Sequence, residues 1–399
     1  MNKPKDIDPF AAARANYPAL ERWTYLDVAA RCVLSRSVRA ALDVHLDDFM
    51  VNGGDKKRYF EIIEETRGRF ARLINAEADE VAYTKNISDG LNMIATGFHW
   101  KRGDNVILCP ELEHPNNVYP WYNMRRYGLE VREVAPRDGH IPVHEIIGRM
   151  DGGTRVVTVS TVSFAPGFRT NVDALGRACR ERGAMLLVDA AQSAGVLHTD
   201  VQRSRIDALA VSTQKGLLGL YGMGFLYCRR EWAERLEPAY LARFGVDLGD
   251  ADAHEASRGG DNYRLMPGAR RFDCGNYNYT AAVAEHVALG ELAALGTERI
   301  ERHATGLAHQ FARGMMALDL PVSGGAPGPH LGHIVTVGRL SDNHYGADDE
   351  RIQGLYEHLV ENRVKLSIRR GTLRFAFHLY NNSDDVARVL ELSRSFLRR

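Results

Sequence analysis

The feature that most constrains the fold of this chain is an alternation of short apolar runs with longer amphipathic runs. Six short runs are rich in Val, Leu, Ile, Ala and Tyr, which is the pattern of strands buried on both faces. They lie at residues 81–84, 106–109, 156–163, 185–189, 208–212 and 223–228. Helical spacing of apolar residues marks residues 58–75 and most of the segments between these runs, such as 172–182. A series of strand, crossover helix and strand predicts a mostly parallel sheet covered by helices on both sides.

The pattern changes beyond the middle of the chain. Residues 247–271 are rich in Gly, Asp, Arg and Ala, and we expect them to form a long loop. Further elements are expected after that loop: a helix over residues 281–304, strands over 333–340 and 373–380, and a helix over 384–397 with Ser383 as its N-cap. A chain of 399 residues is too long for one simple core. We therefore predict a large domain over residues 23–284 and a smaller α+β domain built from residues 1–22 and 285–399.

The charge and the cysteine content exclude several classes of protein. Fifty-one basic residues balance fifty-one acidic ones, so no global field draws the chain onto nucleic acid or an anionic membrane. No uncharged stretch reaches the roughly twenty residues of a membrane helix, and residues 1–23 lack the apolar segment of a secretory signal. We expect a reduced, cytoplasmic protein without a disulfide framework or a metal site, because its cysteines are widely spaced and form no C-x-x-C pair. They are Cys32, Cys109, Cys179, Cys228 and Cys274.

Polar residues with chemical functions follow four of the expected strands. Lys215 follows one of these strands, and Asp189 and Gln192 follow another. Ser88 opens a helix after a third strand, and His114 follows a fourth. Because ligands bind beyond the carboxyl ends of parallel strands, we expect these side chains to share one site. Together these groups suit pyridoxal 5'-phosphate (PLP). A lysine can condense with its aldehyde, an acid can pair with its pyridine nitrogen, a hydroxyl at a helix start can bind its phosphate, and a histidine can stack on its ring.

Each of these residues has a more ordinary role when it is taken alone. A Lys-Gly pair after a strand is usually a solvated turn, and a lone Asp at a strand end is usually a cap or turn residue. Ser88 is by default an N-cap, and His114 is by default an exposed loop histidine. Asp89 would repel a phosphate unless its side chain points away and only its backbone N–H contributes. The joint occurrence of these groups, in chain order and at strand ends, is what favours a cofactor site.

Five segments of the chain resemble one known family. They are YLDVAA (25–30), ISDGLN (87–92), LEHPNNVYPW (112–121), LLVDAAQSAG (186–195) and STQKGLLGLYGMGFLY (212–227). These segments resemble the class V aminotransferase branch of the PLP-dependent fold-type-I enzymes, which includes cysteine desulfurases, selenocysteine lyases and isopenicillin N epimerases. The most specific part is Asp-x-x-Gln followed by a lysine twenty-six residues after the aspartate. The resemblance implies an α/β fold, with a large domain around a mostly parallel seven-stranded sheet and a smaller α+β C-terminal domain.

The resemblance also implies a role for each residue of the cofactor site. Lys215 would form a Schiff base with PLP and would later move the Cα proton of the substrate. Asp189 would pair with the pyridinium nitrogen, and Gln192 would hydrogen-bond the phenolate oxygen. His114 would stack over the ring. Four further residues would hold the phosphate: Ser88, Asp89 through its backbone N–H, Ser212 and Gln214.

Outside the cofactor site, the resemblance implies contacts with an amino acid substrate and with a second subunit. Arg374, in LRFAFHLYNN, would bind the substrate α-carboxylate through its bidentate fork. Ala30 belongs to the Ala-Ala pair that lines the substrate pocket of the family. Asn276, in DCGNYN, stands where the family usually has a threonine that reaches the phosphate of the partner subunit. Because the family works as a homodimer with active sites at the subunit interface, we expect the same here.

The chain departs from the family in three places. Desulfurases transfer sulfur through a nucleophilic Cys shortly before the substrate-binding arginine, but residues 364–375 contain no Cys and none follows Cys274. Phe164 replaces an asparagine that many relatives place near the cofactor and the substrate. Arg31 directly follows the Ala-Ala pair. We expect that either Arg31 or Arg169 meets an acidic or polar side chain of the substrate.

These features together predict a lyase that acts on a free L-amino acid. Deprotonation at Cα and cleavage of a bond at Cβ, for instance C–S, need the lysine, the acid and the arginine but no nucleophilic Cys. An epimerase, an aminotransferase and a C–C bond-forming enzyme would use the same carbanion, so these alternatives stay open. In a desulfurase, a thiol from elsewhere in the chain, such as Cys32, would carry the sulfur. A non-catalytic regulator is disfavoured because Lys215 is present, and a Rossmann dehydrogenase is excluded because the glycines of residues 216–224 precede a strand.

Overall fold

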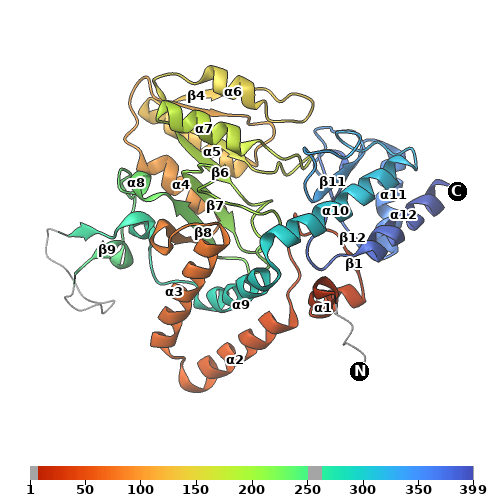
Figure 1. Cartoon of the computed structure of the whole chain (residues 1–399), viewed down its shortest axis with the longest axis horizontal. Helices are drawn as coiled ribbons and strands as arrows, with labels where there is room; N and C mark the ends of the chain where they lie inside the picture. Colours follow the sequence, from red (N-terminus) through yellow and green to blue (C-terminus); the bar gives the residue numbers. More distant parts are fainter. Residues whose placement is uncertain (1–7, 250–262, 399) are drawn as a thin grey trace, which may run out of the picture.

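The computed structural model describes residues 8–249 and 263–398. Figure 1 shows a larger part around a central sheet and a smaller part that holds the C-terminal helices, with the N-terminal helix α1 (Pro9–Ala15) beside it. Within the described residues, no helix is both long and apolar enough to cross a membrane.

The larger part is built around a seven-stranded sheet with the order β2-β8-β7-β6-β5-β3-β4. Its strands are β2 (Val81–Thr84), β3 (Asn105–Leu108), β4 (Glu130–Glu133), β5 (Thr154–Ser160), β6 (Met185–Asp189), β7 (Ala208–Ser212) and β8 (Gly224–Cys228). Every neighbouring pair is parallel except the two pairs that β8 makes. The mostly parallel seven-stranded sheet is therefore confirmed.

Two apolar cores lie on the two faces of this sheet, because alternate residues of each strand point to opposite sides. Six helices contribute to the first core: α2 (Arg36–Asn52), α3 (Lys56–Leu73), α6 (Val143–Arg149), α7 (Val172–Arg182), α9 (Tyr279–Leu295) and, through Ile300, α10 (Thr297–Met316). Three helices contribute to the second: α4 (Ile87–Gly97), α5 (Tyr119–Met124) and α8 (Arg230–Ala233). Burial on both faces explains why the central strands consist of almost uninterrupted apolar residues.

The smaller part has the α+β character expected from the sequence. It contains a three-stranded antiparallel sheet, a short parallel pair of strands and three helices. These elements are β1 (Thr24–Tyr25), α10 (Thr297–Met316), β11 (Ile334–Val337), α11 (Glu350–Glu361), β12 (Val364–Lys365), β13 (Ser367–Arg369), β14 (Thr372–Ala376) and α12 (Ser383–Leu397). Helix α1 joins this part, because Arg14 forms an ion pair with Asp385 of α12 at 2.8 Å and Phe10 stacks on His303 of α10.

Several local expectations need correction. Helix α12 is capped by Asn382 and not by Ser383, since the Asn382 side chain accepts the backbone N–H of Asp385. The helix expected over 281–304 is two helices, which Gly296 separates with a φ of 81°. Buried residues of α9 up to Leu295 belong to the core of the large sheet.

The long loop expected over residues 247–271 is described only at its two ends. Strands β9 (Val246–Asp247) and β10 (Arg264–Leu265) form a short antiparallel pair, and a 3-10 turn at Gly268–Phe272 follows. Residues 250–262 lie outside the described part of the chain.

Candidate active site

Most of the residues singled out in the sequence line one cavity at the carboxyl edge of the large sheet. Strands β5, β6 and β7 end beside this cavity, and helix α4 begins there. Eight of the expected site residues line it: Ser88, His114, Phe164, Asp189, Gln192, Ser212, Gln214 and Lys215. The cavity volume of about 270 Å³ lies just below the roughly 300–1,000 Å³ of common small-molecule sites, so it suits a ligand built on one ring.

Lys215 brings a largely buried amine to this cavity. Burial lowers the pKa of the amine from 10.5 to about 8; the charges of Arg374 and Arg369 act in the same direction, and Asp189 opposes them. Among the residues that the structure describes, no carboxylate lies within ion-pair distance of Nζ. A larger neutral fraction makes the amine a better nucleophile toward an aldehyde.

The lowered pKa of Lys215 predicts a pH dependence of cofactor uptake. Because only the neutral amine attacks an aldehyde, the rate of PLP attachment to the apoprotein should rise about tenfold per pH unit below pH 8 and level off above it. The growth of visible absorption after mixing apoprotein with PLP, measured at a series of pH values, gives this rate. A rate that keeps rising to about pH 10, as for an exposed lysine, would contradict the lowered pKa.

Asp189 and Gln192 contribute a carboxyl and an amide to the lining of the cavity. Asp189 ends β6, and its Oδ1 accepts the backbone N–H of Ala191 at 2.9 Å. Burial raises the pKa of Asp189, whereas the N–H of Ala191 and the charge of Lys215 lower it. Gln192 donates through Nε2 to the carbonyl of Ala29 at 3.2 Å, and its buried Oε1 has no partner among the described residues. The amide therefore has unused hydrogen-bonding capacity for a ligand.

His114 holds an exposed imidazole at the edge of the cavity. It caps the 3-10 turn Pro115–Asn117, with Nδ1 accepting the backbone N–H of Asn116 at 3.2 Å. Partial desolvation lowers the pKa of the ring, and the charge of Lys215 adds to this effect. The ring is therefore neutral at neutral pH, with its proton on Nε2 because Nδ1 accepts. The Phe164 ring lies edge-on to it, with 6.0 Å between centroids.

The first turn of α4 forms the end of the cavity that suits a phosphate. Asn86 caps this helix, and the first backbone N–H groups have no partner within the helix. A helix N-terminus favours an anion because of these donors and the helix dipole. Ser88 of this turn lines the cavity together with Ser212 and Gln214, as the sequence predicts.

Asp89 and Asn276 line a second cavity of about 350 Å³ rather than the first one. The Asp89 carboxylate accepts the backbone N–H of Lys85 at 3.0 Å and the hydroxyl of Tyr240 at 2.5 Å. Its own backbone N–H donates to Asn86 Oδ1 at 3.0 Å. The structure thus turns the Asp89 carboxylate away, as a phosphate would require, but it leaves no backbone N–H of Asp89 free for the phosphate.

Arg374 approaches the cavity from the smaller domain. It lies on β14 and is 2% exposed. Its Nη1 donates to the carbonyl of Phe164 at 3.1 Å, its Nε donates to the hydroxyl of Ser367 at 3.2 Å, and its Nη2 lies 3.9 Å from Oδ1 of Asp27. Burial lowers the pKa of Arg374 to about 10, and Arg369 acts in the same direction. The guanidinium remains charged at neutral pH, and it contacts the backbone of Phe164, which lines the cavity.

Two charged residues beside Arg374 had not been assigned a role from the sequence. Asp27, in the YLDVAA segment, is buried, and its Oδ1 has no hydrogen-bond partner in the described residues. Burial raises the pKa of Asp27, whereas Arg374, Arg369 and Arg31 lower it. Arg369 also lowers the pKa of Lys215, so its charge reaches the cavity. In the sequence, Arg369 is marked only by its position shortly before Arg374, and in the structure it ends β13.

Ala30, Arg31 and Arg169 do not line the main cavity. Ala30 is half-buried, and Arg31 is exposed with a charge that acts on Asp27. Arg169 forms an ion pair with Glu301 at 2.7 Å and lines a separate cavity of about 530 Å³. Arg31 acts on Asp27, a neighbour of Arg374, whereas Arg169 and Arg374 both act on the buried His333.

The residues of the main cavity fit PLP. The buried amine of Lys215, the buried carboxyl of Asp189 and the unsatisfied amide of Gln192 correspond to the three polar groups around a pyridoxal ring. The N-terminus of α4 corresponds to the phosphate. Without such a ligand, the buried polar atom of Gln192 has no partner in the described part of the chain.

Comparison with known proteins agrees with this fit. The chain matches the class V aminotransferase family model over residues 24–389. A probable cysteine desulfurase of Methanothermobacter thermautotrophicus is 29% identical over 387 residues, which cover 94% of each chain. The apo structure of a cysteine desulfurase from Thermococcus onnurineus NA1 has a TM-score of 0.82 at 25% identity, covering 100% of this chain and 99% of that chain.

A further solved structure, of the cystine C–S lyase C-DES with its product cysteine persulfide, has a TM-score of 0.81 at 20% identity and covers 94% of this chain and 99% of its own. At that identity the likeness supports the fold alone. The family match, by contrast, extends over nearly the whole chain and includes all the motifs described above. The protein therefore belongs to the class V aminotransferase family and is a PLP-dependent enzyme.

Proposed function

We propose that the protein cleaves a Cβ bond of the C–S type in a free L-amino acid, and that it does so without forming a persulfide on a cysteine of its own. One observation carries this proposal: Lys215 and Asp189 line one cavity, Arg374 donates to the carbonyl of Phe164 in its lining, and none of the five cysteines lines it. This set of groups serves Cα deprotonation and carboxylate binding, and it offers no sulfur carrier.

Two cysteines beside residues of the site are poor nucleophiles: Cys32, whose backbone N–H donates to the carbonyl of Gln214, and Cys109, whose pKa Glu113 affects. Cys32 donates its thiol to the carbonyl of Gly219 at 3.3 Å, and burial, with the nearby Glu285 as the second cause, raises its pKa to about 12. Burial and the nearby Glu113 also raise the pKa of Cys109 to about 12. Because the thiolate is the reactive form, neither thiol is activated at neutral pH.

Each residue of the site has a distinct part in the proposed reaction. Arg374 binds the substrate α-carboxylate and so fixes the amino acid with Cα toward Lys215. The Lys215 amine takes the Cα proton as a general base, for which its lowered pKa is suited. Asp189 provides the negative charge for the ring nitrogen of the cofactor, and His114 covers one side of the site. When bound, PLP supplies the electron sink that stabilises the charge left at Cα.

The charges around Arg374 favour a substrate with an acidic or polar side chain. Arg369 and Arg31 act on the buried Asp27, as Arg374 does, so three arginines lie near a single carboxylate. The positive excess would attract a second anionic or polar group of the substrate. Arg31, the most exposed of the three, is the proposed contact for this group.

The proposed reaction is tested by a screen of amino acids with the PLP-loaded protein. Products are assayed as keto acid, reduced sulfur, sulfinate-derived sulfur and racemised amino acid. Formation of keto acid together with reduced sulfur from a sulfur-containing amino acid supports the proposal. Racemisation, transfer of the amino group or C–C bond formation as the main outcome would replace the lyase assignment with one of the three alternatives.

A variant without cysteines is expected to keep its turnover. Replacing all five cysteines with serine or alanine should change kcat by less than about threefold once folding is matched by thermal midpoint, because no thiol lines the cavity. Steady-state rates of keto acid formation measure the effect. If Cys32→Ser alone removes activity while the other four replacements do not, the persulfide-free route is wrong and a desulfurase mechanism is restored.

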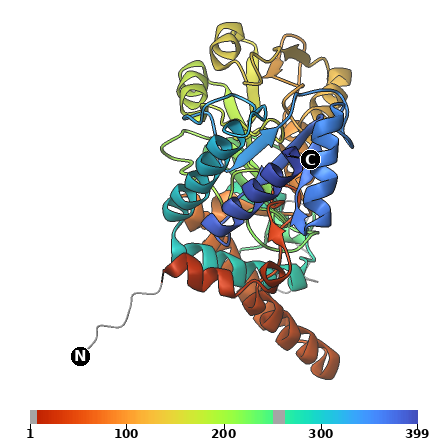
Figure 2. The ribbon, with the colours of Figure 1, turned by 90° about the vertical axis from the view of Figure 1, so that its right-hand side faces the viewer.

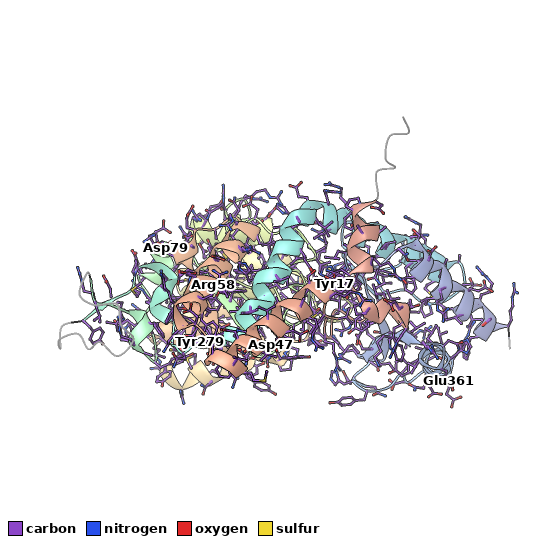
Figure 3. The ribbon with its side chains drawn as sticks, turned by 90° about the horizontal axis from the view of Figure 1, so that it is seen from below. Tyr17, Asp47, Arg58, Asp79, Tyr279 and Glu361 are labelled. Atoms are coloured by element: carbon purple, nitrogen blue, oxygen red, sulfur yellow. The ribbon has the colours of Figure 1, made fainter. Side chains whose placement is uncertain are left out.

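We also propose that the protein is a homodimer with the active site at the subunit interface. Helix α2 projects from the rest of the molecule (Figure 2) and shows a run of exposed apolar side chains. These are Val44, Leu46, Phe49, Met50 and Val51. Seen from below, α2 with Asp47, α3 with Arg58 and the start of α9 with Tyr279 lie in one helical layer (Figure 3), and α9 packs against both other helices. A second copy would bury this apolar surface, which water otherwise contacts.

A charge on the exposed face of α2 is expected to weaken dimerisation. The double variant Phe49→Asp, Met50→Asp should raise the dimer dissociation constant by about tenfold or more, because two carboxylates would be buried against a second apolar surface. Sedimentation velocity over a concentration series measures this constant. Val360→Asp, at an exposed apolar site on α11 in the smaller domain, serves as the control. A wild-type protein that stays monomeric at high micromolar concentration would refute the dimer.

A further inference from the structure

Glu113 is a buried carboxyl next to the cofactor cavity that none of the steps above uses. It is 2% exposed and accepts three hydrogen bonds. The donors are the backbone N–H of Ser160 at 2.6 Å, the hydroxyl of Ser160 at 2.6 Å and Nδ2 of Asn117 at 2.8 Å. Burial, with Asp189 as the second cause, raises the pKa of Glu113 to about 7, and the three donors oppose the rise. All three partners donate, so this pocket is built for the anion.

The partners of Glu113 connect two parts of the cofactor site. Ser160 ends β5, lines the cavity and is the direct partner of Asp189 in the parallel pair of β5 and β6. Glu113 immediately precedes His114 in the chain. Asn117, at the end of the turn that His114 caps, accepts the hydroxyl of Thr158 at 2.8 Å. The segment that carries His114 is therefore hydrogen-bonded to β5 on both sides of the histidine.

We propose that Glu113 is a positioning residue of the cofactor site, which holds His114 over the ring position and places a second negative charge beside Asp189. Glu113 does not line the cavity, so it acts through Ser160, His114 and Asp189 rather than by touching the ligand. The segment from Cys109 to His114 belongs to no helix or strand. The hydrogen bonds of Glu113 therefore connect this segment to β5 in place of strand pairing. This inference depends on PLP binding in the cavity, and it does not depend on which amino acid the enzyme uses.

The test compares Glu113→Ala and Glu113→Gln in the absence of any substrate. Glutamine keeps the shape and one acceptor, but its amide nitrogen faces the donating Nδ2 of Asn117. We expect the PLP dissociation constant to rise about tenfold or more for alanine and by a smaller factor for glutamine. The circular dichroism of bound PLP in the visible, which reports ring orientation, should fall in the same order. Titration of apoprotein with PLP, followed by absorption and dichroism, gives both values.

The charge of Glu113 should also affect the pH dependence of the visible absorption of bound PLP. Above about pH 7, where Glu113 is ionised, both variants remove a negative charge near the cofactor, so the pH at which the visible absorption of the cofactor changes should move to lower pH by about 0.5 unit or more. A purely structural role would not move this midpoint. The measurement uses the holoprotein and can be made with Glu113→Gln alone if the alanine variant does not fold.

Asp207→Asn is the matched control for the loss of a buried carboxylate. Asp207 is buried, accepts the backbone N–H of Leu186 at 2.9 Å and pairs with Arg229. It lies at the amino ends of β6 and β7, away from the cavity at their carboxyl ends. This variant should lower the thermal midpoint without changing PLP affinity, dichroism or the absorption midpoint. If the Glu113 variants behave in the same way, losing only stability, the positioning role is refuted. Failure of the wild-type protein to bind PLP would instead refute the cofactor site itself.

Discussion

Replacing Lys215 with alanine is expected to abolish covalent attachment of PLP and to lower turnover by about 10²–10⁴-fold or more. The amine is both the attachment point and the proposed general base, and no other lysine lines the cavity among the described residues. The loss of visible absorption and of keto acid formation measures the two effects. The fold should persist, because a buried amine with a lowered pKa contributes no favourable ion pair.

Lys101→Ala provides the control for the Lys215 replacement. Lys101 is exposed, lies outside the cavity and carries the same side chain. This control variant should match the wild type in absorption, turnover and thermal midpoint. A Lys215→Ala protein that still shows the wild-type absorption and rate would show that the cofactor is attached elsewhere.

The second large effect is expected for Arg374→Ala. Removing the guanidinium should weaken binding of the amino acid carboxylate by about 2–3 kcal/mol, which is roughly 30- to 150-fold in kcat/KM. Arg374→Lys keeps the charge but loses the two-pronged geometry, so it should recover only part of the loss. Spectral titration with an amino acid gives affinity, and initial rates give kcat/KM. PLP affinity should change little, because Arg374 does not line the cofactor cavity.

Arg374 also has structural partners, so its replacement needs a control for stability. Its guanidinium holds the carbonyl of Phe164, and its charge lowers the pKa of the buried Asp27. Arg229→Ala removes another arginine that pairs with a buried carboxylate, Asp207, at the far edge of the sheet. This variant should lose thermal stability and keep its affinity for the amino acid. Equal affinities in Arg374→Ala and the wild type would remove Arg374 from the substrate site.

The central strands were predictable because their burial leaves a strong pattern in the sequence. The expected bounds of β6 and β7 coincide with those observed, since every residue in them is buried. Strand β4, with the sequence EVRE, was missed because it lies at the sheet edge with exposed and half-buried residues. The break between α9 and α10 was missed because apolar residues continue on both sides of Gly296.

The site was predictable where it depends on strand ends and less so where it depends on contacts between distant segments. Lys215, Asp189 and His114 follow strands whose order brings them to one edge, so chain position alone places them together. The proximity of Asp27 to Arg374 arises because Asp27 forms a parallel bridge with Ala376 across nearly the full length of the chain. No periodicity in the sequence encodes that contact.

The direction in which individual side chains point could not be predicted from the sequence. Asp89 lies in the first turn of α4 next to Ser88, yet its carboxylate turns to Tyr240 while Ser88 lines the cavity. Glu113 precedes His114, yet it is buried and His114 is exposed. Neighbouring residues in a turn point in different directions, and only the packed structure shows which one meets the ligand.

The attachment of PLP to Lys215 is tested most directly by chemical fixation of the cofactor followed by peptide mapping. The wild-type protein is loaded with PLP and reduced with borohydride, which makes a lysine–pyridoxal link permanent, and the proteolytic peptides are then analysed by mass spectrometry. We expect one phosphopyridoxyl group per chain, on Lys215. Label on another lysine, or label spread over exposed lysines with Lys215 unmodified, would contradict that attachment.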